Sequence, residues 1–142
     1  MKNSTTHSNL ETGRKIFGYH LILDLYECNQ ATIGDINTCY CFLDTIPDSM
    51  ATHKQSRPFV VFTKGLGFAG WVPIVESGVS LYTNIPLSFA SIDIYSCKKF
   101  DAEKIKELTL TTFEPKRIKE HYITRGDRYI HPVGLLNERR LT

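Results

Sequence analysis

Apolar residues along the chain follow two different spacings, and each spacing predicts a type of element. Between positions 16 and 27, apolar and β-forming residues partly alternate with polar ones, which predicts a strand. The same criteria predict further strands at 57–65, 69–76, 78–84, 89–97 and 116–124. A glycine-rich turn follows the strand at 57–65, and Pro86 and Ser88 mark a turn between the strands at 78–84 and 89–97.

Two other segments have the three- and four-residue spacing of helices. Asp35 and Asp101 are suitable N-caps for them, and Pro47 should kink or shorten the first helix. The expected apolar faces are Ile36, Cys39, Leu43, Ile46 and Met50 in the first helix, and Ile105, Leu108 and either Leu110 or Phe113 in the second. Runs of strands with two separate helices predict an α+β fold, a two-layer sandwich with a largely antiparallel sheet and helices on one face. The uncovered face needs a partner, which favours a homodimer.

Length and charge narrow the class of protein. A chain of 142 residues suits one domain, expected at 15–126 between a flexible N-terminal tail at 1–14 and a C-terminal extension at 127–142. The 17 basic and 15 acidic residues give a net charge of +2, too close to neutral to favour nucleic acid as a partner. No apolar run reaches the roughly 18 residues needed to span a membrane, and no signal-peptide core is present. A cytoplasmic location is therefore expected.

The four cysteines contain no CxxC pair, and no second Cys/His pair lies close enough for a zinc site. We expect reduced thiols and no metal. Asp24 and Glu27, near the end of the first strand, could hold a ligand hydroxyl or amine, although solvated charges are common at strand ends. His20, His53 and His121 have no evident place at a site, so surface or packing roles are expected for them.

The segment VESGVSLYT at 75–83 interrupts a strand-like pattern with a glutamate, a serine and a glycine. If strands 77–83 and 89–97 pair about a turn centred near Leu87, Ser77 lies opposite Cys97, with Cβ atoms roughly 4.5–5.5 Å apart. A slip of one residue would turn the two side chains to opposite faces. In the alternative interpretation, Ser77 and Gly78 form a bulge, and Cys97 is a small buried residue.

The motifs around this segment are familiar as a set. GFAGWVPIVESGVSLYT, ASIDIYSC and TRG occur in this order, and the flanking GYHLILDLYEC and FEPKRIKEHYITRG extend the similarity over residues 16–126. Together they resemble the S-adenosylmethionine decarboxylase family in its short bacterial and archaeal form. The Glu-Ser step, followed twenty positions later by a cysteine, is the most specific part of the resemblance.

The resemblance implies a self-processing lyase of polyamine and spermidine biosynthesis. Members are zymogens that cut themselves, here between Glu76 and Ser77, so that Ser77 becomes a pyruvoyl cofactor. The pyruvoyl ketone forms a Schiff base with the substrate amine and accepts electrons as carbon dioxide leaves. Cys97 matches the family's proton donor, and thiols ordinarily keep their proton at neutral pH.

The chain departs from the family pattern at the cut. Gly78 stands where the family has the histidine of Glu-Ser-His, Tyr82 replaces a second histidine that assists processing, and Ala69 replaces an assisting serine. The aromatic and the acid of the family's His-Thr-Trp-Pro-Glu are absent from the segment ending at Pro86. Tyr82 could substitute as a hydroxyl donor, but a phenol is a poor base at neutral pH.

Three interpretations therefore stay open. The chain could be a pyruvoyl-dependent decarboxylase of S-adenosylmethionine, or of another amino acid such as ornithine or arginine. It could be a non-processing homologue that acts as a ligand-binding or regulatory subunit. It could also carry out different chemistry on a ligand that resembles S-adenosylmethionine. Keeping both Ser77 and Cys97 favours the first, and losing both processing helpers favours the second.

Overall fold

The computed structural model describes residues 16–126, and the predicted tail at 1–14 and extension at 127–142 lie outside this range. The strands are β1 (Gly18–Tyr26), β2 (Phe59–Thr63), β3 (Gly67–Ile74), β4 (Ser77–Asn84), β5 (Phe89–Ser96) and β6 (Arg117–Arg125). The helices are α2 (Gln30–Ile33), α3 (Ile36–Ser49) and α4 (Ala102–Phe113). Each predicted strand and both predicted helices are present, whereas the single-turn α2 was not predicted.

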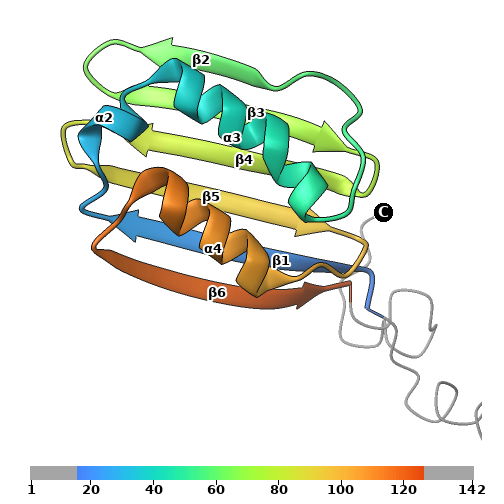
Figure 1. Ribbon diagram of the computed structural model, residues 1–142. Coiled ribbons are helices and arrows are strands. Elements are labelled where there is room, and N and C mark those ends of the chain that lie inside the picture. The colour runs from blue at the N-terminus through green and yellow to red at the C-terminus, as the bar shows by residue number, and fades with distance from the viewer. Residues whose placement is uncertain (1–15, 127–142) are drawn as a thin grey trace, which may run out of the picture.

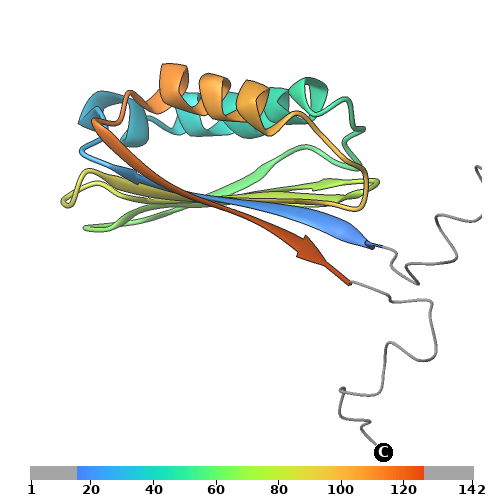
Figure 2. The same cartoon turned by 90° about the horizontal axis from the view of Figure 1, so that it is seen from below.

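The strands form one sheet in the order β2-β3-β4-β5-β1-β6, in which every neighbouring pair is antiparallel (Figure 1). Strand β1 lies between β5 and β6, so the first and last strands of the domain pair with each other. All three helices lie on one side of the sheet, and the other side is left open (Figure 2). This arrangement confirms the predicted α+β two-layer sandwich.

Both predicted helix caps are present. The carboxylate of Asp35 accepts a hydrogen bond from the backbone N–H of Thr38 at the start of α3, and that of Asp101 accepts from Glu103 and Lys104 at the start of α4. These contacts pair N–H groups that have no partner within the helix. Pro47 lies inside α3, which ends only two residues later, at Ser49.

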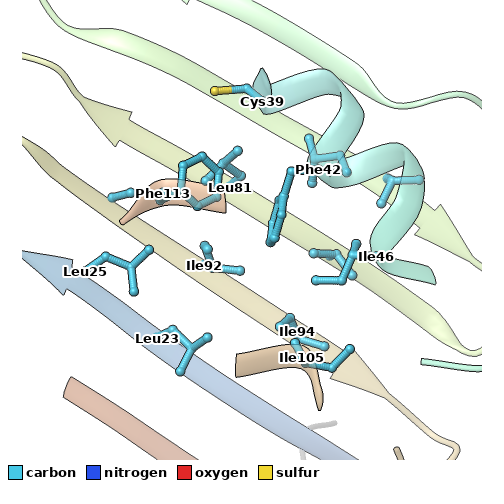
Figure 3. Packing of buried hydrophobic residues seen from close by; sticks show 14 of the residues in the cluster. Leu23, Leu25, Cys39, Phe42, Ile46, Leu81, Ile92, Ile94, Ile105 and Phe113 are labelled. Carbon is cyan, nitrogen blue, oxygen red and sulfur yellow. The ribbon is translucent and has the colours of Figure 1, made fainter. Parts of the chain in front are cut away.

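The core lies between the helices and the inner face of the sheet (Figure 3). Aliphatic side chains of β1, β4 and β5 point toward the helices, and Phe42 of α3 meets Phe113 of α4 with ring centroids 5.0 Å apart. One detail of the predicted helix faces is wrong, because Ile36 is 47% exposed. Ile36 lies in the first turn of α3, where apolar spacing alone overestimates burial. Of the two alternatives for the second helix, Phe113 is the buried residue and Leu110 is exposed.

The open face of the sheet carries large apolar side chains. Trp71 of β3 lies opposite Phe59 of β2. Ala69 of β3 lies opposite Val61 of β2 on one side and opposite Tyr82 of β4 on the other. Phe59, Val61, Trp71 and Tyr82 are 44–65% exposed. Within 16–126, no helix is long and apolar enough to cross a membrane.

Candidate functional site

The interruption predicted near Ser77 is a tight hairpin. Ile74 at the end of β3 pairs directly with Ser77 at the start of β4, so Val75 and Glu76 alone form the connecting turn. Ser77 has a backbone φ of +153°. Residues other than glycine rarely adopt this conformation, and holding one in it costs on the order of 1–3 kcal/mol. The strained torsion is about the N–Cα bond of Ser77, next to the Glu76–Ser77 peptide bond.

The predicted register of the β4–β5 hairpin is wrong by one residue. Ser77 lies opposite Ser96, not opposite Cys97. Cys97 instead follows the end of β5, and its backbone N–H donates a hydrogen bond to the carbonyl oxygen of Glu76 at 2.8 Å. The cysteine therefore contacts the peptide group between Glu76 and Ser77 through its backbone, a contact that the register prediction did not include.

The Glu76 side chain is a second unfavourable feature of this turn. Its Oε2 atom is buried and has no hydrogen-bond partner among the described residues. An unpaired buried polar atom costs on the order of 1–3 kcal/mol, and more for a charged group. The segment 76–77 thus combines a strained backbone with an unsatisfied carboxylate, and such features occur preferentially at functional sites.

A hollow of about 410 Å³ opens on the open face beside Ser77, and we refer to it as the Ser77 hollow. On one side it is lined by Trp71 of β3 together with Ser77, Gly78 and Ser80 of β4. On the other side, His20, Asp93, Tyr95 and Arg125 come from β1, β5 and β6. Five strands, β1, β3, β4, β5 and β6, therefore contribute to one concave polar surface.

His20 is the residue of this hollow that the sequence did not reveal. Its Nε2 lies 3.0 Å from Asp93 Oδ1, and its Nδ1 lies 3.5 Å from an Arg125 Nη1. Because arginine can only donate, these contacts are satisfied when Nε2 carries the hydrogen and Nδ1 accepts. Alternation along β1 puts His20 on the face opposite Leu21, but no local signal in the sequence could place that face beside Ser77.

The structure does not bring Tyr82 to Ser77 within one chain. Tyr82 lies five residues further along β4, which is roughly 16 Å at the usual rise of a strand. It pairs directly with Ala69 of β3 and, on its other side, with Ser91 of β5. Ala69 and Tyr82, the two positions at which the resemblance implies processing helpers, thus face each other, away from the Glu76–Ser77 peptide bond. Any action of Tyr82 on Ser77 would require a second copy of the chain.

The four thiols differ sharply in their surroundings. Burial raises the pKa of Cys28 to about 11 and that of Cys39 to about 12, so both stay protonated and inert inside the core. Cys41 and Cys97 are exposed. Cys41 lies on α3, on the helical side of the sheet. Cys97 is therefore the accessible thiol beside Ser77.

A solved adenosylmethionine decarboxylase shares this fold. That crystal structure, from Aquifex aeolicus, superimposes with a TM-score of 0.70 over 90% of this chain and 99% of the other, at 22% identity. The sequence model of the S-adenosylmethionine decarboxylase family matches residues 19–126. The chain belongs to this family.

Proteins described as S-adenosylmethionine decarboxylase proenzymes are similar along most of their length. The protein from Sulfurihydrogenibium sp. (strain YO3AOP1) is 30% identical over 122 residues, which cover 85% of this chain and 91% of that one. The protein from Persephonella marina is 30% identical, over 82% of this chain and 88% of its own. One from Clostridium botulinum (strain Langeland) is 29% identical, over 79% of this chain and 97% of its own.

Proposed function

We propose that the chain is a proenzyme that cuts itself between Glu76 and Ser77 and then decarboxylates an amino-acid substrate, S-adenosylmethionine or a related one. The observation that carries the proposal is the 2.8 Å hydrogen bond from the Cys97 backbone to the Glu76 carbonyl, next to a strained Ser77. It supports the proposal because a serine, a carbonyl that accepts a hydrogen bond and a cysteine belong to residues that meet at one hairpin turn. Family membership supports the same activity.

The cut would proceed by attack of Ser77 Oγ on the carbonyl carbon of Glu76. A bond forms between Oγ and this carbon, the C–N bond breaks, and the Ser77 nitrogen takes up a proton, so the amide becomes an ester. Negative charge develops on the carbonyl oxygen during the attack, and the Cys97 N–H is already directed at that oxygen. A donor in this position typically contributes 10²–10³-fold in rate. Loss of the α-hydrogen of residue 77 then breaks the Cβ–Oγ bond, which releases the Glu76 carboxylate and leaves dehydroalanine as the new N-terminus. Water hydrolyses its imine tautomer to the pyruvoyl ketone, and the nitrogen leaves as ammonia.

The surroundings of Ser77 fit a pyruvoyl group. The residue begins β4 and lines the Ser77 hollow, so a group formed from it opens onto a concave surface of about 410 Å³. A pyruvoyl group supplies a carbonyl that accepts electrons from the substrate as carbon dioxide leaves. The exposed Cys97 thiol would return a proton to the substrate carbon. Polyamine biosynthesis in the cytoplasm is the role that this activity would serve.

The mass of the purified protein tests the proposal. We expect two chains, 1–76 and 77–142, with the second blocked at its N-terminus, in place of a single species of 16.2 kDa. Release of carbon dioxide from S-adenosylmethionine, ornithine or arginine then identifies the substrate. A chain that stays intact after long incubation overturns the proposal.

An intact chain would favour the second candidate, a non-processing homologue that acts as a ligand-binding or regulatory subunit. The separation of Tyr82 from Ser77 is the observation in its favour, since the chain by itself brings no processing helper from that position to the cut. Binding of S-adenosylmethionine by the intact chain, without release of carbon dioxide, would establish this candidate.

We further propose a homodimer in which the open faces of two copies meet. The exposed Phe59, Val61 and Tyr82 form the apolar contact on that face, and large apolar patches on soluble proteins often mark interfaces. Light scattering after gel filtration should give a mass twice the 16.2 kDa of one chain. Phe59→Glu should shift it toward the monomer, whereas Leu87→Glu, at the exposed β4–β5 turn, should not. A monomeric wild-type chain contradicts the proposal.

A further inference from the structure

Gly78 lies inside strand β4, where a glycine normally weakens the strand because it has no side chain to pack. Its backbone does not explain the choice, because its φ is not among the positive values found at Gly65, Gly67 and Gly126. The space above Gly78 explains why a glycine is present there. A Cβ atom added at Gly78 would lie 2.7 Å from Nε1 and 3.4 Å from Cε2 of Trp71.

Trp71 therefore occupies the place that a side chain at position 78 would need. Its direct cross-strand partners are Ser80 and Phe59, so the indole leans along β4 toward Ser77 to reach Gly78. A contact of 2.7 Å is too short for a real Cβ atom, so the indole would have to move if position 78 carried a side chain. A side chain at 78 and the observed position of Trp71 thus exclude each other.

The same indole forms one wall of the Ser77 hollow, opposite Tyr95 on β5. Tyr95 is itself held in position, because its ring fills the space over Gly18 and the guanidinium of Arg125 lies 5.5 Å from its centroid. Trp71 remains 49% exposed. Part of its ring is therefore available to a molecule that enters the hollow next to Ser77.

We infer that Trp71 is a specificity-determining residue of the Ser77 site. Its indole packs against the carbon chain of the amino-acid substrate beside the reacting carbon, and Gly78 is the residue that lets the indole lie there. This inference rests on the proposed function for the identity of the ligand, but the pairing of Trp71 with Gly78 does not. Aromatic side chains suit this role because they offer a large, stiff contact area.

The pairing can be tested by fluorescence, because Trp71 is the only tryptophan in the chain. We expect Gly78→Ala to shift its emission to longer wavelength as the indole is displaced. Gly65→Ala is the matched control: Gly65 has a positive φ, so alanine is strained there, but nothing lies within 4 Å of the added atom. It should leave the emission unchanged. An unchanged spectrum in Gly78→Ala overturns the pairing, whatever the enzyme's activity.

The recognition role can be tested on the processed enzyme. Trp71→Ala should still cut itself but should raise KM at least about tenfold with kcat changed less than about threefold, and Trp71→Phe should recover part of the loss. Gly78→Ala should raise KM by a similar factor. The double variant with Trp71→Ala should have a KM close to that of Trp71→Ala alone. An unchanged KM in Trp71→Ala overturns the role.

Ligand binding tests recognition without turnover. S-adenosylmethionine, ornithine and arginine are added in turn to the wild-type chain, and at least one should change the Trp71 emission in a saturable way. If none does, the inference fails, whether or not carbon dioxide is released. If one does and no cut occurs, Trp71 recognises the ligand and only the proposed decarboxylase function fails.

Discussion

Ser77→Ala should leave the chain as one intact species of 16.2 kDa, with no blocked N-terminus at residue 77 and no release of carbon dioxide. Alanine has no hydroxyl to attack the Glu76 carbonyl, so the amide cannot become an ester. Losing both the nucleophile and the source of the cofactor should reduce turnover to background, the largest functional effect expected of any single substitution. Mass spectrometry of the denatured protein provides the measurement.

Ser80→Ala is the matched control for this substitution. Ser80 also lies on β4 and lines the Ser77 hollow, but its hydroxyl is three residues from the cut. This variant should cut itself as the wild type does. Cleavage at position 77 in Ser77→Ala would show that the cut does not use the serine hydroxyl, and cleavage at a different bond would place the hairpin turn outside the reaction.

Cys97→Ala should separate the cut from the decarboxylation. The contact with the Glu76 carbonyl comes from the backbone N–H of Cys97 at 2.8 Å, and alanine keeps this N–H. Self-cleavage should therefore continue at close to the normal rate. Turnover should fall by about 10²–10⁴-fold, the usual contribution of a positioned proton donor, or the product carbon should be protonated without stereochemical control.

Cys41→Ala is the control, since Cys41 is the other exposed cysteine and lies on α3. It should affect neither step. Deuterium incorporation into the product, measured in heavy water, distinguishes controlled from uncontrolled protonation. If turnover and stereochemistry are both unchanged in Cys97→Ala, the thiol is not the proton donor. If cleavage is lost as well, the side chain has a part in the cut that the backbone contact does not explain.

Most elements of the fold followed from patterns within short windows. Helix α3 was predicted from Asp35 and from apolar residues such as Leu43 and Ile46, because a cap and a periodic face act within a few turns. The same holds for the strands, in which alternating side chains reflect one buried and one open face. Single-turn α2 was missed, because four residues are too few to establish a period.

Short sequence patterns predicted only part of the arrangement of residues near Ser77. The interruption of the strand pattern pointed to the residues of the turn, and the resemblance to a family pointed to Ser77 and Cys97. The register was wrong by one position because the β4–β5 loop spans residues 85–88 and is centred between Pro86 and Leu87, not at Leu87. A shift of one residue changes which atoms meet, so the backbone contact from Cys97 to Glu76 was not foreseen.

The sequence alone was sufficient for the family, the layer architecture and the two residues proposed to react, since each depends on local order along the chain. The Ser77 hollow depended on the tertiary structure. Placing β1 between β5 and β6 brings His20 and Arg125 to the same surface as Ser77. The fit of Trp71 over Gly78 likewise depends on the pairing of β3 with β4. Strand order and register arise from the packing of the whole sheet, and no short segment encodes them.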